Sequence, residues 1–384
     1  MLHYLKKIVI SCVKFLLWFF PIKKGKIVIE NFQGRGFGDN PKYISNRIMH
    51  LNLPFKLVWL VRGDVELPNG IKKVQFASIK AFYELATAEI IIDNCKSPLS
   101  SRFKKKKKQF YLQTWHGDFP LKYIEKEVED SLWPDYVKAS KADSAVTDAI
   151  ISGNKFFTKI LKESFWLPDT CKILEYGVPR NDIYFKGKDL KNELKSKYRF
   201  VESDKILLYA PTFRDNLSTD YYNLDFDKIR DCLYKKYGDE WKIIVRLHPG
   251  IAKKADLFSY NENIINGSVY PDPQELCFIS DCLITDYSSL MADFILMKKP
   301  VYLYVPDLEK YSDKSTGRGL RDIFYKLPFH FCKTQDELEA EINTLNFDEY
   351  LVKLQEFMNK YYESFDDGHA SEKVVNYLKS VISK

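Results

Sequence analysis

Short apolar runs alternate with helix-length stretches of mixed polarity along the chain from residue 26. The first series predicts buried strands, each bounded by turn or charged residues, at 26–30, 56–62, 73–76, 90–93 and 109–115. Helical patterns lie between these runs, for example at 41–51 and 78–88. A second series predicts strands, again separated by helices, at 206–211, 242–249, 282–285 and 301–306. Strands that alternate with helices indicate parallel, doubly wound sheets, so the pattern predicts the α/β class with two sheets.

The two series of strands predict two Rossmann-like domains that face each other across a cleft, which is a GT-B-like arrangement. A chain of 384 residues is long enough for two cores of ordinary domain size. We expect an N-terminal domain at 25–195 and a C-terminal domain at 196–345, with a polar linker and helix at 186–205. Residues 346–384 have apolar positions at helical spacing and predict closing C-terminal helices.

The N-terminal segment 1–24 combines lysines with an apolar run. Residues 8–20 are nearly all apolar, but 13 residues are fewer than the about 20 that a membrane span needs. No small-residue cleavage site follows, which disfavours a signal peptide. The segment therefore predicts an amphipathic helix in a membrane surface, inserting Phe15, Leu16, Trp18, Phe19 and Phe20. The alternative is a helix docked on the protein's own core.

Composition places the chain among folded globular proteins, with 45% hydrophobic and 29% charged residues. The seven cysteines are scattered and form no CxxC pair, which favours a reducing compartment and disfavours a disulfide framework or a structural zinc site. The net charge of +7 is concentrated in the N-terminal segment and in the five lysines at 104–108. Such a run is either a solvated loop or a surface for phospholipid, nucleic acid or a polyphosphate substrate.

Polar residues at predicted strand ends carry the candidate chemistry, because ligands of open α/β sheets bind at the carboxyl ends of strands. The strand at 282–285 stops before Asp286, and Ser288 and Ser289 stand at the start of the next helix. A helix N-terminus with small hydroxyl residues is suited to phosphate, through free backbone amides and the helix dipole. The alternatives are plain helix capping by Ser288 and a turn-shaping role for Asp286.

Basic residues follow two further strands of the second series. Arg246 and His248 end the strand at 242–249 and are expected to project to the same side, where guanidinium and imidazole together favour an anion. Arg214 follows the strand at 206–211 in a similar way. In the first series, His116 comes directly after a strand, where it is a general base, a phosphate ligand or a packed side chain.

Taken together, these stretches resemble the CDP-glycerol glycerophosphotransferase family, whose members build teichoic acids and related polyol-phosphate polymers. The residues that match its WHG-x-PLK motif are Trp115, His116, Gly117, Pro120, Leu121 and Lys122. Further matches are NPK at 40–42, GxPRND at 177–182, PTxR at 211–214, HP at 248–249 and TDYSS at 285–289. The resemblance runs from about residue 26 to 345.

The chain departs from the family pattern at two places. After the WHG motif the family usually has one threonine, whereas this chain has Asp118 and Phe119. One residue is therefore changed and one is added. At 318–322 the chain reads RGLRD where the family has RGFYFD. We expect both departures to lie at substrate contacts, where they would bear on which polyol is used.

The resemblance implies a phosphotransfer, in which a hydroxyl of a membrane-linked acceptor attacks the polyol-side phosphorus of a CDP-polyol and CMP leaves. It implies that His116 is the general base and that His248 acts at the leaving phosphate. The implied contacts of the nucleotide and its phosphates are Arg214, Arg246, Asp286, Ser288, Ser289 and Arg318. The implied residues of the acceptor side are Asn40, Gly117, Asp118 and Lys122. The N-terminal domain is then the acceptor-binding domain, and the C-terminal domain binds the CDP-polyol.

The partners that this reaction implies are CDP-glycerol or CDP-ribitol, a lipid-linked acceptor of the undecaprenyl-diphosphate type and an anionic membrane surface. No known nucleic-acid motif accompanies the lysine runs, so we expect no nucleic-acid partner. The sequence shows no carboxylate cluster with metal-ligand spacing, so we expect no metal or other cofactor held by the protein. Mg²⁺ can still accompany the nucleotide. The expected location is peripheral, at the cytoplasmic face of the bacterial cell membrane.

Two other functions stay open at this point. A GT-B glycosyltransferase that uses a nucleotide sugar shares the fold and the phosphate contacts. A non-catalytic basic protein that binds membranes shares the lysine runs. Within the family, the length of 384 residues favours a priming transferase slightly over a polymerase.

Overall fold

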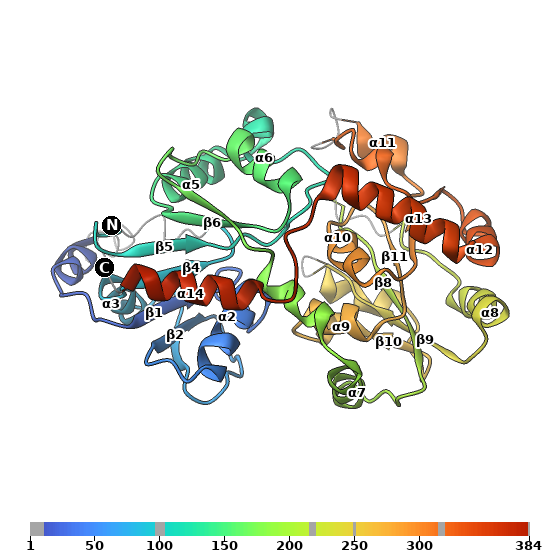
Figure 1. Cartoon of the computed structure of the whole chain (residues 1–384), viewed down its shortest axis with the longest axis horizontal. Coiled ribbons are helices and arrows are strands. Elements are labelled where there is room, and N and C mark those ends of the chain that lie inside the picture. The colour runs from blue at the N-terminus through green and yellow to red at the C-terminus, as the bar shows by residue number, and fades with distance from the viewer. Residues whose placement is uncertain (1–10, 97–103, 215–219, 249–250, 314–318, 383–384) are drawn as a thin grey trace. The chain divides into compact units, whose positions relative to one another are not determined.

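The computed structural model describes residues 11–96, 104–214, 220–248, 251–313 and 319–382. The chain forms two α/β units, each built around one parallel sheet (Figure 1). The first unit runs to residue 116 and takes in 125–182 and 365–384, while the second comprises 117–124 and 183–364.

Seven parallel strands form the sheet of the first unit, in the order β3-β2-β1-β4-β5-β6-β7. The strands are β1 (Lys26–Glu30), β2 (Lys56–Val61), β3 (Lys72–Gln75), β4 (Ile90–Asp93), β5 (Phe110–Gln113), β6 (Ala149–Ser152) and β7 (Lys172–Glu175). The order reverses between β1 and β4, and such a switch point opens a crevice at the carboxyl ends of the two strands.

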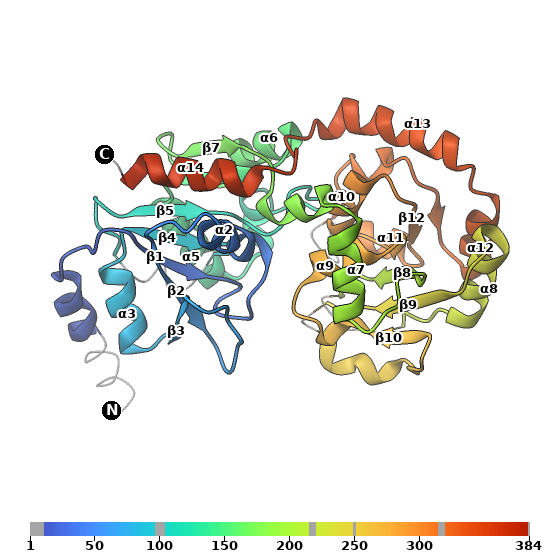
Figure 2. The same ribbon diagram turned by 60° about the horizontal axis from the view of Figure 1, so that its bottom comes forward.

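Helices cover both faces of this sheet (Figure 2). Helices α2 (Asp39–His50) and α14 (Ala370–Ile382) pack with Ile27 and Ile29 of β1, whereas α3 (Ile79–Ala86) packs with Val28 on the other face. Strands buried on both faces are apolar along their length, which explains the run at 26–30. The unit also contains η1 (Glu125–Ser131), α5 (Pro134–Ser144), α6 (Lys155–Ser164) and the start of η2 (Pro179–Phe185).

Six parallel strands form the sheet of the second unit, in the order β10-β9-β8-β11-β12-β13. The strands are β8 (Lys205–Ala210), β9 (Trp241–Val245), β10 (Ile264–Asn266), β11 (Cys282–Thr285), β12 (Val301–Tyr304) and β13 (Phe331–Cys332). The α-helices are α7 (Lys188–Lys197), α8 (Phe226–Tyr237), α9 (Pro273–Ile279), α10 (Leu290–Phe294), α11 (Leu308–Ser312), α12 (Gln335–Thr344) and α13 (Phe347–Phe357). The shorter turns are η3 (Ala252–Leu257), η4 (Gly267–Val269), η5 (Ile295–Met297), η6 (Phe324–Lys326) and the π-helix η7 (Met358–Tyr362).

Every strand predicted from the sequence is present, and three have the predicted bounds. The largest difference among the predicted strands is at β9, which ends at Val245 instead of residue 249. Sequence reasoning gave no bounds for β6, β7, β10 and β13, which are only two to four residues long. The shortest of them, β10 and β13, carry too few residues for a clear apolar period.

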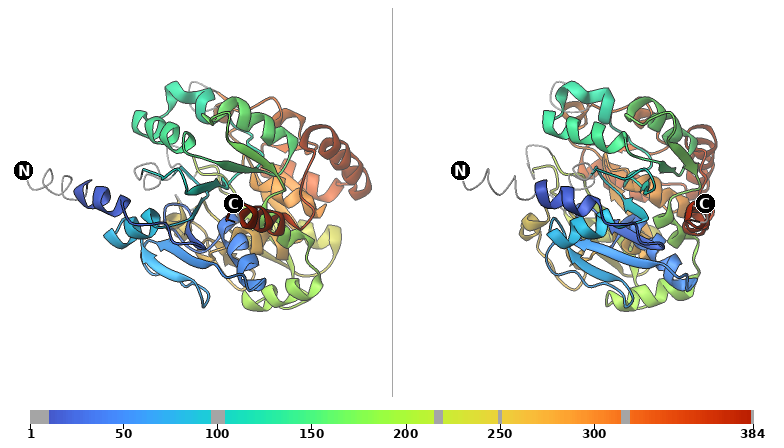
Figure 3. Two further views of the ribbon diagram at one scale, coloured as in Figure 1. Left: turned by 60° about the vertical axis from the view of Figure 1, so that its left-hand side comes forward. Right: turned by 90° about the vertical axis from the view of Figure 1, so that its left-hand side faces the viewer.

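The helical residues 11–18 lie beside α3 at one edge of the first unit (Figure 3). Nζ of Lys14 stands 4.3 Å from the ring centroid of Phe82, and Trp18 donates a hydrogen bond of 2.9 Å to the carbonyl oxygen of Lys104. Trp18 is therefore held by the protein, and its predicted insertion into a membrane is not supported. Four apolar side chains of the segment are exposed: Phe15, Leu16, Phe19 and Phe20. Within the described residues, no helix combines the length and the apolar character that crossing a membrane requires.

The division of the chain differs from the predicted boundaries at 195 and 345. The longer segment of the second unit begins at residue 183, because α7 belongs to this unit: Nζ of Lys191 is 2.8 Å from Asp281, and Tyr198 donates to Glu275. The predicted closing segment 346–384 is also divided. Its first part belongs to the second unit, and α14 returns to the first.

The return of α14 predicts a stability effect far from any strand-end motif. Leu378 is fully buried in the core of the first unit, so Leu378→Ala should lower the free energy of unfolding of that unit by about 2–5 kcal/mol. Chemical denaturation measures the change. The matched control is Leu257→Ala, at a leucine that is 56% exposed, and equal effects of the two substitutions would contradict the assignment of α14 to the core.

Candidate active site

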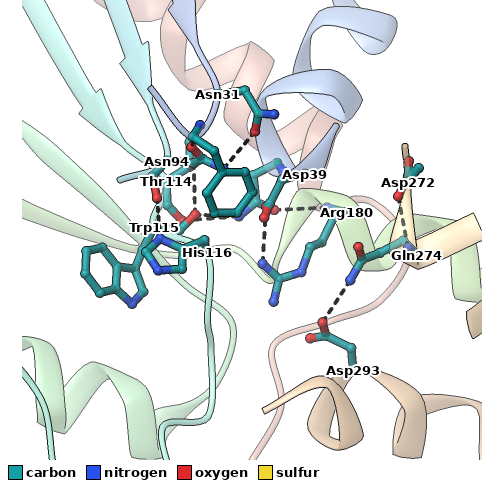
Figure 4. Close-up of polar contacts among 12 residues, drawn as sticks. Asn31, Asp39, Asn94, Thr114, Trp115, His116, Arg180, Asp272, Gln274 and Asp293 are labelled. Carbon is teal, nitrogen blue, oxygen red and sulfur yellow. Dashed lines mark hydrogen bonds and ion pairs between the residues drawn. The ribbon is translucent and has the colours of Figure 1, made fainter. Parts of the chain in front are cut away.

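The turn that carries His116 follows β5 (Figure 4), and Asn40 fixes it. Nδ2 of Asn40 donates to the carbonyl oxygens of Thr114 and Trp115, each 3.2 Å away. Trp115 has a φ of 52°, in a region that bulky residues seldom adopt, so these hydrogen bonds hold a strained turn. Asn40 is buried and accepts a hydrogen bond of 3.1 Å from the backbone nitrogen of Arg180. Asn40 therefore shapes the turn, and its expected place on the acceptor side stays a prediction.

His116 is held so that one ring nitrogen stays available. Its Nδ1 lies 2.7 Å from the carbonyl oxygen of Asn94, which can only accept, so Nδ1 carries the hydrogen and Nε2 keeps its lone pair. The rings of Trp115 and Phe32 lie nearby, with centroids 4.3 and 5.4 Å from that of His116. Burial lowers the pKa of His116, although the hydrogen bond to Asn94 and the charge of Asp39 oppose the shift. A neutral imidazole with a free Nε2 can take a proton from a hydroxyl.

A buried ion pair supports the same turn. Nη1 of Arg180 lies 3.2 Å from Oδ1 of Asp39, and both side chains are largely buried. Arg180 belongs to the 177–182 motif, and so does Asp182, whose carboxylate accepts from the first two backbone nitrogens of α14 at 2.8 Å each. Sequence reasoning assigned no site role to these residues, because their partners are 141 and 188 positions away.

The predicted acceptor-side residues at 117–122 lie in the second unit. Asp118 and Phe119 are buried, with 4% and 1% exposure. Asp118 accepts a hydrogen bond of 3.4 Å from the hydroxyl of Tyr362, and the ring of Phe119 lies 5.3 Å from that of Tyr362 and 6.0 Å from that of Phe357. The expectation that this departure from the family pattern contacts substrate is therefore wrong, because both side chains belong to the interior of the unit.

Lys122 is tied to the second departure from the family pattern. Its Nζ lies 2.7 Å from the hydroxyl of Tyr311, and its backbone forms an antiparallel bridge with Leu320. The backbone nitrogen of Arg321 donates to the carbonyl oxygen of Leu121 at 2.8 Å, and its Nε donates to that of Lys122 at 3.1 Å. Leu320 and Arg321 thus brace the segment that contains the first departure. Arg318, a predicted phosphate contact, lies outside the described residues.

Arg214, which follows β8, forms a buried network with two carboxylates: Asp286 after β11 and Asp307 after β12. Its Nε and Nη2 donate to Asp307 at 2.7 and 2.9 Å, and its Nη1 donates to Asp286 at 2.9 Å. Burial alone would lower the pKa of Arg214, but Asp286 and Asp307 raise it. Oδ1 of Asp286 accepts from the backbone nitrogens of Thr212 and Tyr287 at 2.8 and 2.6 Å. The predicted direct phosphate contacts of Arg214 and Asp286 are not supported, because both side chains are occupied in shaping the two loops.

Ser288 and Ser289 precede α10, which has only five residues. Oγ of Ser288 accepts from the backbone nitrogen of Leu290 at 3.2 Å, so the capping alternative holds for Ser288. Ser289 makes no capping hydrogen bond, and its Oγ would lie 3.6 Å from a Cβ placed on Gly117. The structure thus brings one predicted acceptor-side residue next to one predicted phosphate-side residue. The buried hydroxyl of Thr212 has no hydrogen-bond partner within the described residues.

Arg246 and His248 do not form the predicted anion-binding pair. Nη1 of Arg246 donates to the carbonyl oxygens of Gly267 and Tyr270 at 2.8 and 2.7 Å, and burial lowers the pKa of Arg246. His248 is exposed, and its ring stacks on Phe213 with the centroids 4.4 Å apart. The prediction of a common direction was wrong, because β9 ends before both residues and strand alternation does not extend to them. Among the described residues, no group of three or more histidine, cysteine, aspartate or glutamate side chains could hold a metal ion.

Two parallel α/β sheets with polar groups at the carboxyl ends of their strands define a GT-B-like transferase fold. A family model described as CDP-Glycerol:Poly(glycerophosphate) glycerophosphotransferase matches residues 12–380, and the chain belongs to this family. The resemblance inferred from the motifs is thereby confirmed.

Two similar proteins are teichoic acid poly(glycerol phosphate) polymerases. The one from Staphylococcus epidermidis is 31% identical over 382 residues, which cover 94% of this chain and 51% of that protein. The one from Bacillus spizizenii is 30% identical over 390 residues, which cover 96% of this chain and 95% of that protein. The chain spans about half the length of the Staphylococcus epidermidis polymerase and of a Bacillus subtilis polymerase of the same name.

The solved structures of the wall teichoic acid polymerase TagF are similar over the whole chain. One superposes with a TM-score of 0.84 at 29% identity and covers 100% of this chain and 97% of that chain. Another, of a TagF variant soaked with CDPG, has a TM-score of 0.84 at 28% identity and the same coverage. This likeness confirms the predicted α/β, GT-B-like fold class.

The Arg214 network predicts a large loss of stability on removal of the cation. Arg214→Met would leave the buried Asp286 and Asp307 without their counter-charge, and it should lower the free energy of unfolding by about 3–5 kcal/mol. Urea denaturation of the second unit measures this. The control Lys333→Met removes the cation of an exposed ion pair with Glu309 and should change stability by at most about 1 kcal/mol. An effect of Arg214→Met as small as that of the control would contradict the structural role of the network.

Proposed function

We propose that this protein transfers glycerol phosphate from CDP-glycerol to a hydroxyl of a membrane-linked acceptor and releases CMP, in the synthesis of teichoic acid or a similar cell-envelope polymer. The observation that carries the proposal is the orientation of His116 in a chain of this family. Its Nδ1 is bound to a carbonyl oxygen, which leaves Nε2 as a proton acceptor. The likeness to a TagF structure described with CDPG supports the choice of donor.

In the proposed step, the acceptor oxygen forms a bond to the glycerol-side phosphorus, and the bond from that phosphorus to the CMP oxygen breaks. Nε2 of His116 takes the hydroxyl proton, and CMP leaves with the bonding electron pair. We assign His248 to the leaving phosphate, because its ring is exposed after β9. The groups that remain to hold the pyrophosphate are the hydroxyls of Thr212, Ser288 and Ser289. We also keep Lys122 as a proposed residue of the acceptor side.

CDP-ribitol is the alternative donor in this proposal, and Mg²⁺ enters only with the nucleotide. We infer no metal or other cofactor held by the protein, because phosphate charge is met by hydrogen-bond donors in the proposed site. The acceptor is inferred to be a lipid-linked chain of the undecaprenyl-diphosphate type, which places the reaction at a membrane surface.

We infer that the protein binds the cytoplasmic face of the membrane peripherally, through the N-terminal helix. Phe15 and Leu16 on that helix and Phe19 directly after it are 64%, 63% and 64% exposed, although the other side of the helix is docked. Nζ of Lys104 and of Lys106 lie 5.7 and 5.9 Å from the ring of Trp18, so the lysine run adjoins the same helix. Exposed aromatic side chains beside lysines suit an anionic lipid surface.

The donor is tested by offering CDP-glycerol, CDP-ribitol and UDP-sugars with acceptor-bearing vesicles and measuring the nucleotide released. We expect CDP-glycerol to release CMP at least about tenfold faster than CDP-ribitol does. A tenfold difference corresponds to about 1.4 kcal/mol less stabilisation of the transition state with the unmatched polyol. Faster CMP release from CDP-ribitol would show that CDP-ribitol, and not CDP-glycerol, is the preferred donor. Release of UDP alone would favour a glycosyltransferase and refute the proposal.

The membrane surface is tested by replacing three exposed apolar residues with serine: Phe15, Leu16 and Phe19. Vesicle sedimentation with anionic lipid should show binding weakened roughly tenfold or more, because the insertion of apolar surface is lost. The matched control replaces three exposed valines of the second unit with serine: Val201, Val269 and Val352. Equal binding by the two triple variants would contradict the inference that the N-terminal helix binds the membrane.

A further inference from the structure

The ends of β1 and β4 carry the same pair of residue types at the switch point of the first sheet. Glu30 and Asp93 are the last residues of the two strands and stand in register with each other. Each is followed by an asparagine, and Nδ2 of Asn94 donates to Oδ1 of Asn31 at 2.8 Å. Both asparagines are buried, with 0% and 3% exposure. We call this hydrogen-bonded pair the asparagine clasp (Figure 4).

The asparagine clasp holds the loop that follows β1. Oδ1 of Asn94 accepts from the backbone nitrogen of Phe32 at 2.8 Å, and Nδ2 of Asn31 donates to the carbonyl oxygen of Arg35 at 2.8 Å. Phe32 and Gln33 have φ angles of 42° and 59°, which side-chain-bearing residues rarely adopt. A strained pair of this kind persists only where surrounding contacts fix it, and the clasp supplies them.

The same asparagine also holds His116. The carbonyl oxygen of Asn94 accepts the hydrogen of Nδ1 of His116, at 2.7 Å. The ring of Phe32, which is 37% exposed, lies 5.4 Å from the imidazole ring. One residue therefore fixes both the histidine and an exposed aromatic side chain beside it.

We propose that the asparagine clasp is a positioning device for the transfer reaction: it orients His116 and presents Phe32 as the wall on which the carbon chain of the acceptor's terminal polyol packs. This inference rests on the proposed function. Phe32 offers an apolar face to the C–H groups of a polyol, while the hydroxyl groups stay free to meet Nε2 of His116. The asparagines act through other groups and are positioning residues.

The clasp also suits the electrostatics of the histidine. The charged groups that act on His116 are Asp39 of α2, Arg180 of η2 and Glu125 of η1. Beneath the clasp, burial and the charge of Glu30 raise the pKa of Asp93, which favours its neutral form. An amide pair can fix the loop without adding a charge, so His116 keeps the pKa that burial has lowered.

The positioning role is tested by nitrogen NMR of histidine-labelled protein, which reports the tautomer and pKa of His116 without any turnover. The signal of His116 among the six histidines is assigned by its loss in His116→Gln. In Asn94→Ala the loop is released and water reaches the ring, so we expect a mixed tautomer and a pKa that rises toward the ordinary value. The matched control, Asn154→Ala, removes a buried asparagine that caps α6 and should leave both quantities unchanged.

A second variant keeps the test decisive if Asn94→Ala does not fold. Asn31→Asp preserves the oxygen that accepts from Asn94 but adds a charge, and it should raise the pKa of His116 as well. An unchanged tautomer and pKa in the folded variants would overturn the positioning role.

The wall is tested by steady-state kinetics of Phe32→Ala and Phe32→Leu. We expect the acceptor KM to rise roughly tenfold in Phe32→Ala and less in Phe32→Leu, with the KM for CDP-glycerol unchanged, because only acceptor binding is lost. Phe185→Ala, at a phenylalanine that is 46% exposed in the second unit, is the control. An unchanged acceptor KM in Phe32→Ala would contradict the proposal that the acceptor packs on Phe32. Absence of CMP release by the unaltered protein would refute the proposed function, and the NMR result would still decide the clasp.

Discussion

The hydrogen bond from Nδ1 of His116 to the carbonyl oxygen of Asn94 is the interaction on which the proposed role of His116 depends. Asn94 follows β4 directly, at the point where the strand order reverses, so the sheet itself fixes the position of the acceptor oxygen. A carboxylate in that place would raise the pKa of the imidazole, whereas a carbonyl oxygen orients the ring without adding charge. Because burial also lowers the pKa, the histidine is kept neutral with Nε2 unprotonated.

In the second unit, charged side chains and not neutral ones fix the loops at the strand ends. At its switch point, Arg214 is paired with Asp286 and Asp307, and the three side chains join the loops after β8, β11 and β12. Removing Arg214 would leave two buried carboxylates without their counter-charge, so these loops depend on the one cation. Among the described residues of this region, the buried hydroxyl of Thr212 has no hydrogen-bond partner, and the proposed phosphate contacts include it. Preorganised donors of this kind stabilise developing charge without rearrangement.

The sequence was sufficient for the parts of the structure that depend on local pattern. Strands buried on both faces read as apolar runs, and polar residues such as His116 and Asp286 could be placed at strand ends from that pattern alone. The partners of those residues could not be predicted, because Arg214 meets Asp307 from 93 positions away and Asp182 caps α14 from 188. The burial of Phe119 was hidden for the same reason, since no local pattern shows that 117–124 leaves the first unit.

In the proposed reaction, His116 accepts the proton of the attacking hydroxyl while CMP leaves CDP-glycerol. Single-turnover CMP release on acceptor-bearing vesicles, compared between the unaltered protein and His116→Gln, tests it most directly. His116→Gln should bind CDP-glycerol with unchanged affinity and release CMP at least about 100-fold more slowly, as the loss of a general base requires. CMP release by His116→Gln at the rate of the unaltered protein would contradict it.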